Sequence, residues 1–262
     1  MTQFDDSLAL EAVGPGQWRG RALPLFVANN GMFGGWTVAL LLKAVISHPD
    51  ATGSAIAITV NFVAAVAPGS TLTLRVACLG AGRSVAHWRC DLMIEGGDTL
   101  LATATVILAN RRDSDQFTEG RMPEIPQPET LPAFQPPFPG NPPLEVRSDT
   151  SGLPYKKSDT RTLGWEKETS GRAIDVLTLA LLSDLGAPRV FTISPGPRPS
   201  ATLTLSVNFL ATEAELAACG DDFILSEMIA TRIEQSINGS RKTMWSRAGT
   251  MLATSEQLCW FR

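Results

Sequence analysis

The 262-residue sequence predicts an α+β fold built from two similar halves in tandem. Two observations lead to this fold class. Short sequence words recur at nearly constant spacing, and each half contains one apolar helix followed by strand-like runs, as in an α+β unit with an antiparallel sheet. A proline-rich segment separates the halves. We therefore expect a first unit over residues 1–111, a connector over 112–150 and a second unit over 151–262.

The repeat is carried by two words. Val60-Asn61-Phe62-Val63 returns from position 207 as Val207-Asn208-Phe209-Leu210, an offset of 147 residues. Leu101-Ala102-Thr103 returns from position 252 as Leu252-Ala253-Thr254, an offset of 151. Because two words at nearly one offset are unexpected by chance, the repeat indicates that the chain arose by duplication of a single unit.

The connector is defined by its proline content. A dense run of prolines excludes helix and disfavours strand pairing, so we expect an extended segment. Phe134, Phe138 and Leu144 are expected to anchor it across the surface. The prolines are Pro123, Pro126, Pro128, Pro132, Pro136, Pro137, Pro139, Pro142 and Pro143.

Each half is predicted to begin with a helix, over residues 34–47 and 173–185. The first helix is apolar on nearly every side, which predicts that it is buried. A sheet wrapped round such a central helix is the hot-dog arrangement, so we expect two hot-dog units in tandem. The alternating and apolar runs that predict the strands lie at 55–64, 71–79, 84–95 and 100–108 in the first half, and at 201–211, 222–234, 242–248 and 250–260 in the second.

Composition excludes several other classes. With 22 basic and 26 acidic residues and no basic block, the chain lacks the charge pattern of a nucleic-acid binder. The apolar runs are too short to span a membrane, and the acidic N-terminus does not resemble a signal peptide. The four cysteines form no C-x-x-C pair and only two histidines occur, so we expect no metal or other cofactor. Reduced thiols suggest a cytoplasmic protein.

Two motifs in the first half carry a family resemblance. Asn29-Asn30-Gly31-Met32-Phe33-Gly34-Gly35 resembles an N-G-x-F-G-G entry to a hot-dog helix, and Gly80-Ala81-Gly82-Arg83-Ser84 resembles a G-R-S turn into a long strand. Both motifs are similar to those of the acyl-CoA thioesterase II family, whose members have a double hot-dog fold. The resemblance implies an acyl-CoA substrate and a homo-oligomer, most simply a dimer.

The resemblance also implies three catalytic residues in the second half. The family places an aspartate late in the helix, a threonine or serine entering the next strand, and a glutamine on the last strand. The positions that match are Asp184 in Ser183-Asp184-Leu185, Thr202 before Ser206-Val207-Asn208-Phe209, and Gln257.

The residues themselves allow this chemistry. Asp184 follows an apolar run at 176–182, so burial would raise its pKa and make it a better base. An exposed acid at a helix end has the same pattern and is slightly disfavoured there by the helix dipole. Thr202, Thr204, Ser206 and Asn208 alternate with apolar residues, which places all four on one strand face. A row of this kind is also typical of an ordinary exposed face.

Gln257 and the two glycines supply neutral groups. A glutamine amide can donate and accept, so Gln257 could orient a water molecule, although an ordinary strand residue is an equal alternative. The repeat aligns it with Val106, so only the second half has the amide. Gly34 and Gly35 begin the first helix, where free N–H groups could bind the thioester oxygen as an oxyanion hole, or simply form a turn. In hot-dog proteins the helix start of one unit faces the partner unit's sheet, so both halves would build each site.

No pattern for covalent catalysis is found. The sequence has no G-x-S-x-G word, and His48 and His87 both lie where a structural role is expected. The sequence therefore favours an acyl-CoA thioesterase that uses direct attack by water beside an apolar tunnel. Two alternatives remain: a double hot-dog enoyl-CoA hydratase or dehydratase, whose usual D-x-N-x-x-H pattern is not found, and a non-catalytic acyl-CoA or lipid-binding protein.

Overall fold

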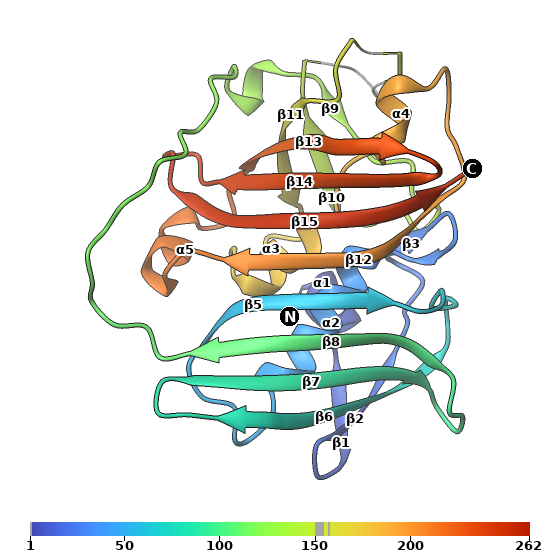
Figure 1. Ribbon diagram of the computed structural model, residues 1–262, viewed down its shortest axis with the longest axis vertical. Coiled ribbons are helices and arrows are strands. Elements are labelled where there is room, and N and C mark those ends of the chain that lie inside the picture. The colour runs from blue at the N-terminus through green and yellow to red at the C-terminus, as the bar shows by residue number, and fades with distance from the viewer. Residues whose placement is uncertain (1, 150–154, 157) are drawn as a thin grey trace.

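One large antiparallel sheet organises the molecule (Figure 1). The computed structural model describes residues 2–149, 155–156 and 158–262, so the expected unit boundary at 150/151 lies outside the described residues. The strand order is β1-β2-β6-β7-β8-β5-β12-β15-β14-β13-β11-β10-β9, and β3 and β4 form a separate pair. Strands of the first half occupy one end of the sheet and strands of the second half the other, joined between β5 and β12.

The first half contains a buried helix and a set of long strands close to the expected ranges. Its small N-terminal helix and first four strands were not predicted, since they are short and partly exposed. The elements are α1 (Gln3–Ser7), β1 (Leu10–Gly14), β2 (Gln17–Arg21), β3 (Val27–Ala28), β4 (Gly31–Met32), α2 (Gly34–Ile46), β5 (Ser54–Phe62), β6 (Thr71–Ala81), β7 (Val85–Ile94) and β8 (Leu100–Ala109).

The second half repeats this order with a shorter helix. The proline-rich segment adds the short turn η1 (Pro128–Thr130) and two strands, β9 (Ala133–Phe134) and β10 (Leu144–Arg147), to the sheet edge. The remaining elements are β11 (Thr162–Glu168), α3 (Val176–Leu182), α4 (Val190–Ile193), β12 (Ser200–Phe209), α5 (Glu213–Cys219), β13 (Ile224–Glu234), β14 (Ile237–Trp245) and β15 (Met251–Phe261). The predicted helix 173–185 was too long because Asp175 caps α3 and the chain turns at Ser183.

Strand pairing confirms the repeat. Val60 pairs with Ala104 in the first half and Val207 pairs with Ser255 in the second, which preserves both sequence offsets. The two halves meet where β5 and β12 pair about Thr59 and Ser206. These two residues are themselves repeat equivalents, and their hydroxyl oxygens lie 3.1 Å apart. The seam therefore has a local twofold symmetry that follows from duplication.

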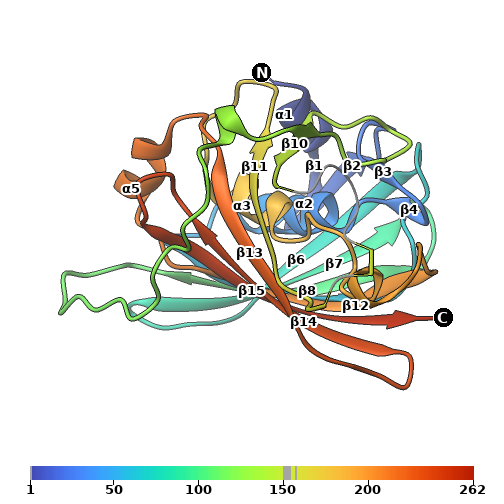
Figure 2. The same cartoon turned by 90° about the horizontal axis from the view of Figure 1, so that it is seen from above.

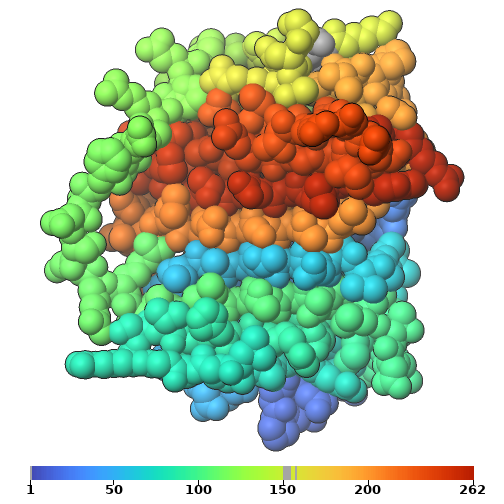
Figure 3. Space-filling view, in the orientation of Figure 1, coloured from blue at the N-terminus to red at the C-terminus, as the bar shows by residue number. Residues whose placement is uncertain are grey.

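The helices lie on one face of the curved sheet. Figure 2 shows α2 and α3 next to each other in its hollow, where they pack together. Their crossing is close, because a Cβ on Gly35 would lie 2.1 Å from the carbonyl oxygen of Leu181. The opposite face, in Figure 3, is formed by strands of both halves, and connector residues run along one side. No helix in the described part of the chain has the length and apolar character needed to cross a bilayer.

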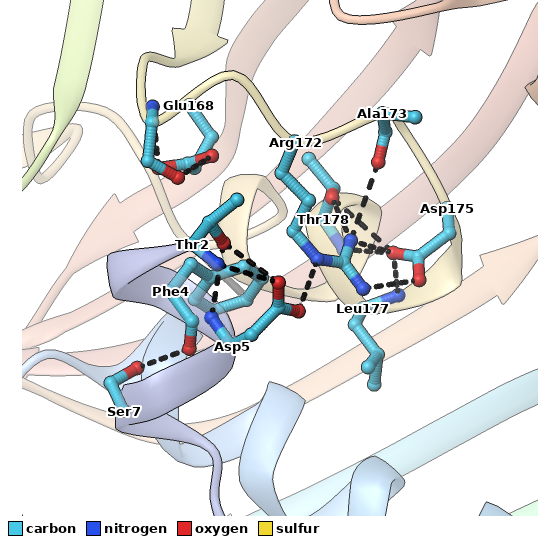
Figure 4. A network of polar contacts seen from close by, with 11 residues as sticks. Thr2, Phe4, Asp5, Ser7, Glu168, Arg172, Ala173, Asp175, Leu177 and Thr178 are labelled. Atoms are coloured by element: carbon cyan, nitrogen blue, oxygen red, sulfur yellow. Dashed lines mark hydrogen bonds and ion pairs between the residues drawn. The ribbon is translucent and has the colours of Figure 1, made fainter.

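Polar contacts tie the start of α3 to the first half (Figure 4). Arg172 forms two bonds of 2.6 Å to the carboxylate of Asp175, which caps α3 by accepting from the N–H groups of Leu177 and Thr178. The same guanidinium donates to Asp5 of α1 at 2.8 Å. Because α3 has only seven residues, such contacts rather than its own hydrogen bonds fix its position.

Candidate active site

Asp184 lies at the junction of the two halves. It stands two residues beyond the end of α3 and faces the first turn of α2, where its carboxylate accepts a hydrogen bond from the backbone N–H of Gly35. A helix N-terminus favours negative charge, so α2 stabilises the carboxylate of Asp184, whereas the C-terminal end of α3 disfavours it. The first half thus supplies a positive dipole end to an acid of the second half.

A β-bulge places Thr202 next to the acid. Thr202 pairs with Cys259 and Thr204 pairs with Leu258, so Leu203 is an extra residue in β12. The bulge breaks the alternation and turns Thr202 towards the helices. The prediction that Thr202 shares a face with Thr204, Ser206 and Asn208 was therefore wrong, because that prediction assumed a regular strand.

Gln257 connects the three predicted catalytic residues. On β15 it pairs with the buried Leu205, so both side chains face the helices. Its amide nitrogen donates to Oδ1 of Asp184 at 2.6 Å and to Oγ1 of Thr202 at 2.7 Å. The structure thus brings an acid, a hydroxyl and an amide together from three separate elements, and all three side chains are partly buried.

Burial dominates the electrostatic setting of Asp184. Burial raises the pKa of its carboxyl group to about 7, while the charge of Lys242, the N–H of Gly35 and the amide of Gln257 pull in the opposite direction. A carboxylate with a pKa of about 7 accepts a proton more readily than an exposed one and is still about half ionised at pH 7.

The two glycines allow the second half to approach the start of α2 closely. A Cβ on Gly34 would lie 2.5 Å from Oδ2 of Asp184, and one on Gly35 would meet Leu181. The side-chain positions of the two glycines are thus taken up by the acid and by α3, and the N–H of Gly35 is already bonded to Asp184. The two glycines predicted that another group comes close to this backbone, but the sequence did not show that the groups are Asp184 and Leu181.

The first half keeps the backbone of this site without its polar groups. Its pairing skips Ile56 between Ala55 and Ala57, so β5 has a bulge at the repeat equivalent of Leu203. Ala55 therefore occupies the place of Thr202, and Val106 that of Gln257. The asymmetry inferred from the sequence extends to the hydroxyl as well as the amide.

Other reactive side chains near the site do not form a nucleophile pair. The sulfur of Cys259 lies 3.8 Å from the hydroxyl of Thr202, but burial raises the pKa of this thiol to about 12, which keeps it neutral. His48 packs on Trp88 with ring centroids 4.8 Å apart, and His87 is exposed on β7. No group of three or more potential metal ligands occurs among the described residues.

Two surface cavities lie away from the three side chains. One of about 510 Å³ is lined by Ile193 to Arg198, directly before β12, and one of about 860 Å³ lies between residues 117–122 and the start of β15. Asp184, Thr202 and Gln257 line neither of them, so neither is the apolar tunnel expected beside the site.

The sequence and the fold both match known proteins. Residues 25–109 match the model of the acyl-CoA thioesterase N-terminal domain, and residues 119–261 match that of the acyl-CoA thioesterase C-terminal domain. No curated protein matches the sequence significantly.

Solved structures share the fold over the full length. A hot-dog-fold protein of unknown function from Alicyclobacillus acidocaldarius is 31% identical with a TM-score of 0.94, and the match covers 100% of this chain and 98% of that one. A putative thioesterase from Novosphingobium aromaticivorans is 22% identical (TM-score 0.82, covering 97% and 98%). The TesB protein of Mycobacterium avium subsp. paratuberculosis is also 22% identical (TM-score 0.82, covering 99% and 98%). Because the C-terminal model alone matches more than half of the sequence, the chain belongs to the acyl-CoA thioesterase family and has its double hot-dog fold.

Proposed function

We propose that the protein hydrolyses acyl-CoA thioesters by direct attack of water, with Asp184 as general base. The observation that carries this proposal is the convergence of Asp184, Thr202 and Gln257 through bonds of 2.6 and 2.7 Å beside the first turn of α2. Family membership supports the substrate class, and the raised pKa of Asp184 supports its role.

The proposed reaction has two stages. The water oxygen attacks the thioester carbonyl carbon while Asp184 takes the water proton, and Thr202 and Gln257 orient the water. The tetrahedral oxyanion lies at the start of α2, where the backbone N–H of Gly34 and the helix dipole favour negative charge. The carbon–sulfur bond then breaks, and Asp184 returns the proton to the departing thiolate. The products are the free acid and CoA with its thiol.

Thiol release from a series of acyl-CoA substrates tests the proposal. Wild-type protein is expected to release thiol, and Asp184→Asn is expected to reduce kcat by about 10²-fold or more because the base is lost. Lys167→Met is a matched control, since Lys167 forms an exposed ion pair with Asp221 at 3.5 Å. Wild-type turnover by Asp184→Asn would remove Asp184 from the mechanism.

Two further assays separate the alternatives. Hydration of an enoyl-CoA without thioester cleavage would identify a hydratase. Tight acyl-CoA binding without release of either product would identify a binding protein. The hydratase alternative has no specific feature of the site in its favour, because His48 packs on Trp88 and His87 is exposed on β7.

A further inference from the structure

A buried ion pair lies directly behind the acid. Lys242 on β14 and Glu166 on β11 are 2% and 5% exposed, and the ammonium of Lys242 lies 2.7 and 2.9 Å from the two carboxylate oxygens of Glu166. The hydroxyl of Ser226 donates to the same carboxylate at 2.8 Å. Burying two charges is costly, so such a pair needs a reason beyond stability.

The ammonium of Lys242 also holds the turn that carries Asp184. It donates to the carbonyl oxygens of Leu182 and Leu185, both at 2.6 Å. The carbonyl of Ser183 accepts from the hydroxyl of Ser255 at 3.3 Å. Backbone groups on both sides of Asp184 are therefore fixed by side chains of β14 and β15. Four acceptor oxygens surround this nitrogen, which favours the protonated amine because an ammonium has three hydrogens to donate and a neutral amine only two.

The first half shows that the fold does not need this pair. Lys242 pairs with Ser255 as Cys90 pairs with Ala104, so Cys90 is the repeat equivalent of Lys242. In the neighbouring strands, Glu166 pairs with Ile224 as Gly20 pairs with Leu72, so Gly20 is the repeat equivalent of Glu166. The first half thus forms the same sheet round its helix without the pair, and it also lacks the hydroxyl and the amide.

We propose that Lys242 is a positioning residue of the active site: its ammonium fixes the Asp184 turn and places a positive charge behind the acid, while Glu166 holds the ammonium from its far side. This inference rests on the proposed function. Lys242 touches neither substrate nor water and acts through Asp184. The Lys242–Glu166 pair occurs in the second half because Asp184 there needs a fixed position and a positive charge beside it.

The charged and titratable groups round Asp184 define what a pH measurement reports. Lys242 on β14 favours the ionised acid, and the thiol of Cys259 on β15 is neutral. Behind Lys242 lie Glu166 on β11 and the buried Arg189 before α4, which interact with Lys242 and with each other. Removal of the Lys242 charge therefore raises the pKa of Asp184 above its value of about 7.

The first experiment compares pH profiles of kcat/KM for thioester cleavage. The variant is Lys242→Met combined with Glu166→Gln, which removes both charges of the buried pair and leaves Arg189 bonded to the carbonyl oxygens of Thr160 and Ala187. Its acidic limb is expected to move up by about one unit, which lowers kcat/KM at pH 7 roughly five-fold because the ionised fraction of the base falls. Lys167→Met, from an exposed pair on the strand of Glu166, is expected to keep the wild-type profile. A folded double variant with an unmoved limb would overturn the proposal, since a purely structural role changes only the melting temperature.

The second experiment needs no change at Lys242. Nitrogen-15 NMR of the Lys242 ammonium is followed across pH 5 to 9 in wild-type protein and in Asp184→Asn. A titration step near pH 7 is expected in the first and absent in the second, because the ammonium senses the acid beside it. A wild-type signal with no such step refutes the coupling, even if the double variant fails to fold. If wild-type protein cleaves no thioester, the proposed function fails, while this measurement still decides whether Lys242 and Asp184 are coupled.

Discussion

Gly34→Ala tests the close packing of Asp184 against α2. A Cβ at this position would lie 2.5 Å from Oδ2 and 3.3 Å from Cγ of Asp184, whereas the ring of Phe62 at 3.5 Å is at normal contact distance. The carboxylate is the flexible end of a side chain, so it moves and the backbone stays. Relieving the contact takes a shift of roughly 0.7–1 Å, and a misplacement of about 1 Å in a catalytic group costs on the order of 10²-fold in rate. We expect kcat/KM to fall about 30- to 100-fold, or roughly 2–3 kcal/mol.

Stability is expected to change little in this variant. Gly34 stands at the start of α2, and alanine is favoured over glycine in a helix by up to about 1 kcal/mol, which offsets the new contact. The assay is thiol release from acyl-CoA, combined with thermal melting followed by circular dichroism.

The control for Gly34→Ala is Gly80→Ala. A Cβ on Gly80 meets no atom within 4 Å, so this variant is expected to match wild type in both measurements. Wild-type kcat/KM in a folded Gly34→Ala protein would show that the position of the carboxylate against α2 is irrelevant to the reaction.

Four further outcomes follow from the same contacts. Because the base must be ionised and burial raises the pKa of Asp184 to about 7, kcat/KM is expected to fall as pH drops below 7. A kcat/KM that stays unchanged down to pH 5 would exclude Asp184 as the base. That folded-state pKa exceeds the unfolded value of 3.8, so the native state holds a proton that the unfolded chain releases, and stability declines as pH rises from about 4 to 7. Asp184→Asn removes this effect and should raise the melting temperature at pH 8 more than at pH 5; equal changes at both pH values would contradict the burial. Thr202→Ser should retain most of kcat and Thr202→Val should lose roughly 10-fold, with equal rates arguing against a role for the hydroxyl. For Asp5, burial raises the pKa but hydrogen bonds from Arg172 and Thr2 outweigh it and hold the pKa at about 2, so its stabilising effect is present above pH 4 and disappears towards pH 2. Urea unfolding of Asp5→Asn should therefore show a deficit at pH 6 that closes near pH 2; a deficit independent of pH would refute the ion pair.

Long periodic segments explain what sequence reasoning predicted well. The predicted helix 34–47 differs from α2 by one residue, since an apolar run ended by His48-Pro49 allows few other structures. Strands β1 and β2 were missed because their residues are mostly exposed and give no apolar alternation. Within the proline-rich segment, β10 was missed because proline content was taken to disfavour pairing over the whole range.

Sequence reasoning named three residues that the structure brings together, but it did not predict their geometry. Asp184, Thr202 and Gln257 do converge, yet the face of Thr202 depends on one extra residue, Leu203, that no local pattern reveals. Lys242 escaped notice because β14 carries polar residues on both faces, so its alternation does not show which side is buried. The contact of Asp184 with Gly34 joins residues 150 positions apart and depends on how two helices cross.

Fusion of the halves into one chain changes what each can evolve. In a pair of identical subunits, every substitution occurs twice, so a residue that benefits one catalytic centre is imposed on both. Here Ala55 and Val106 pack as plain apolar side chains while their counterparts carry the polar groups. The free-energy cost of burying the Asp184 carboxylate falls on the second half alone. The first half still contributes its helix end to the polar cluster of the second, because the N–H of Gly35 donates to Asp184.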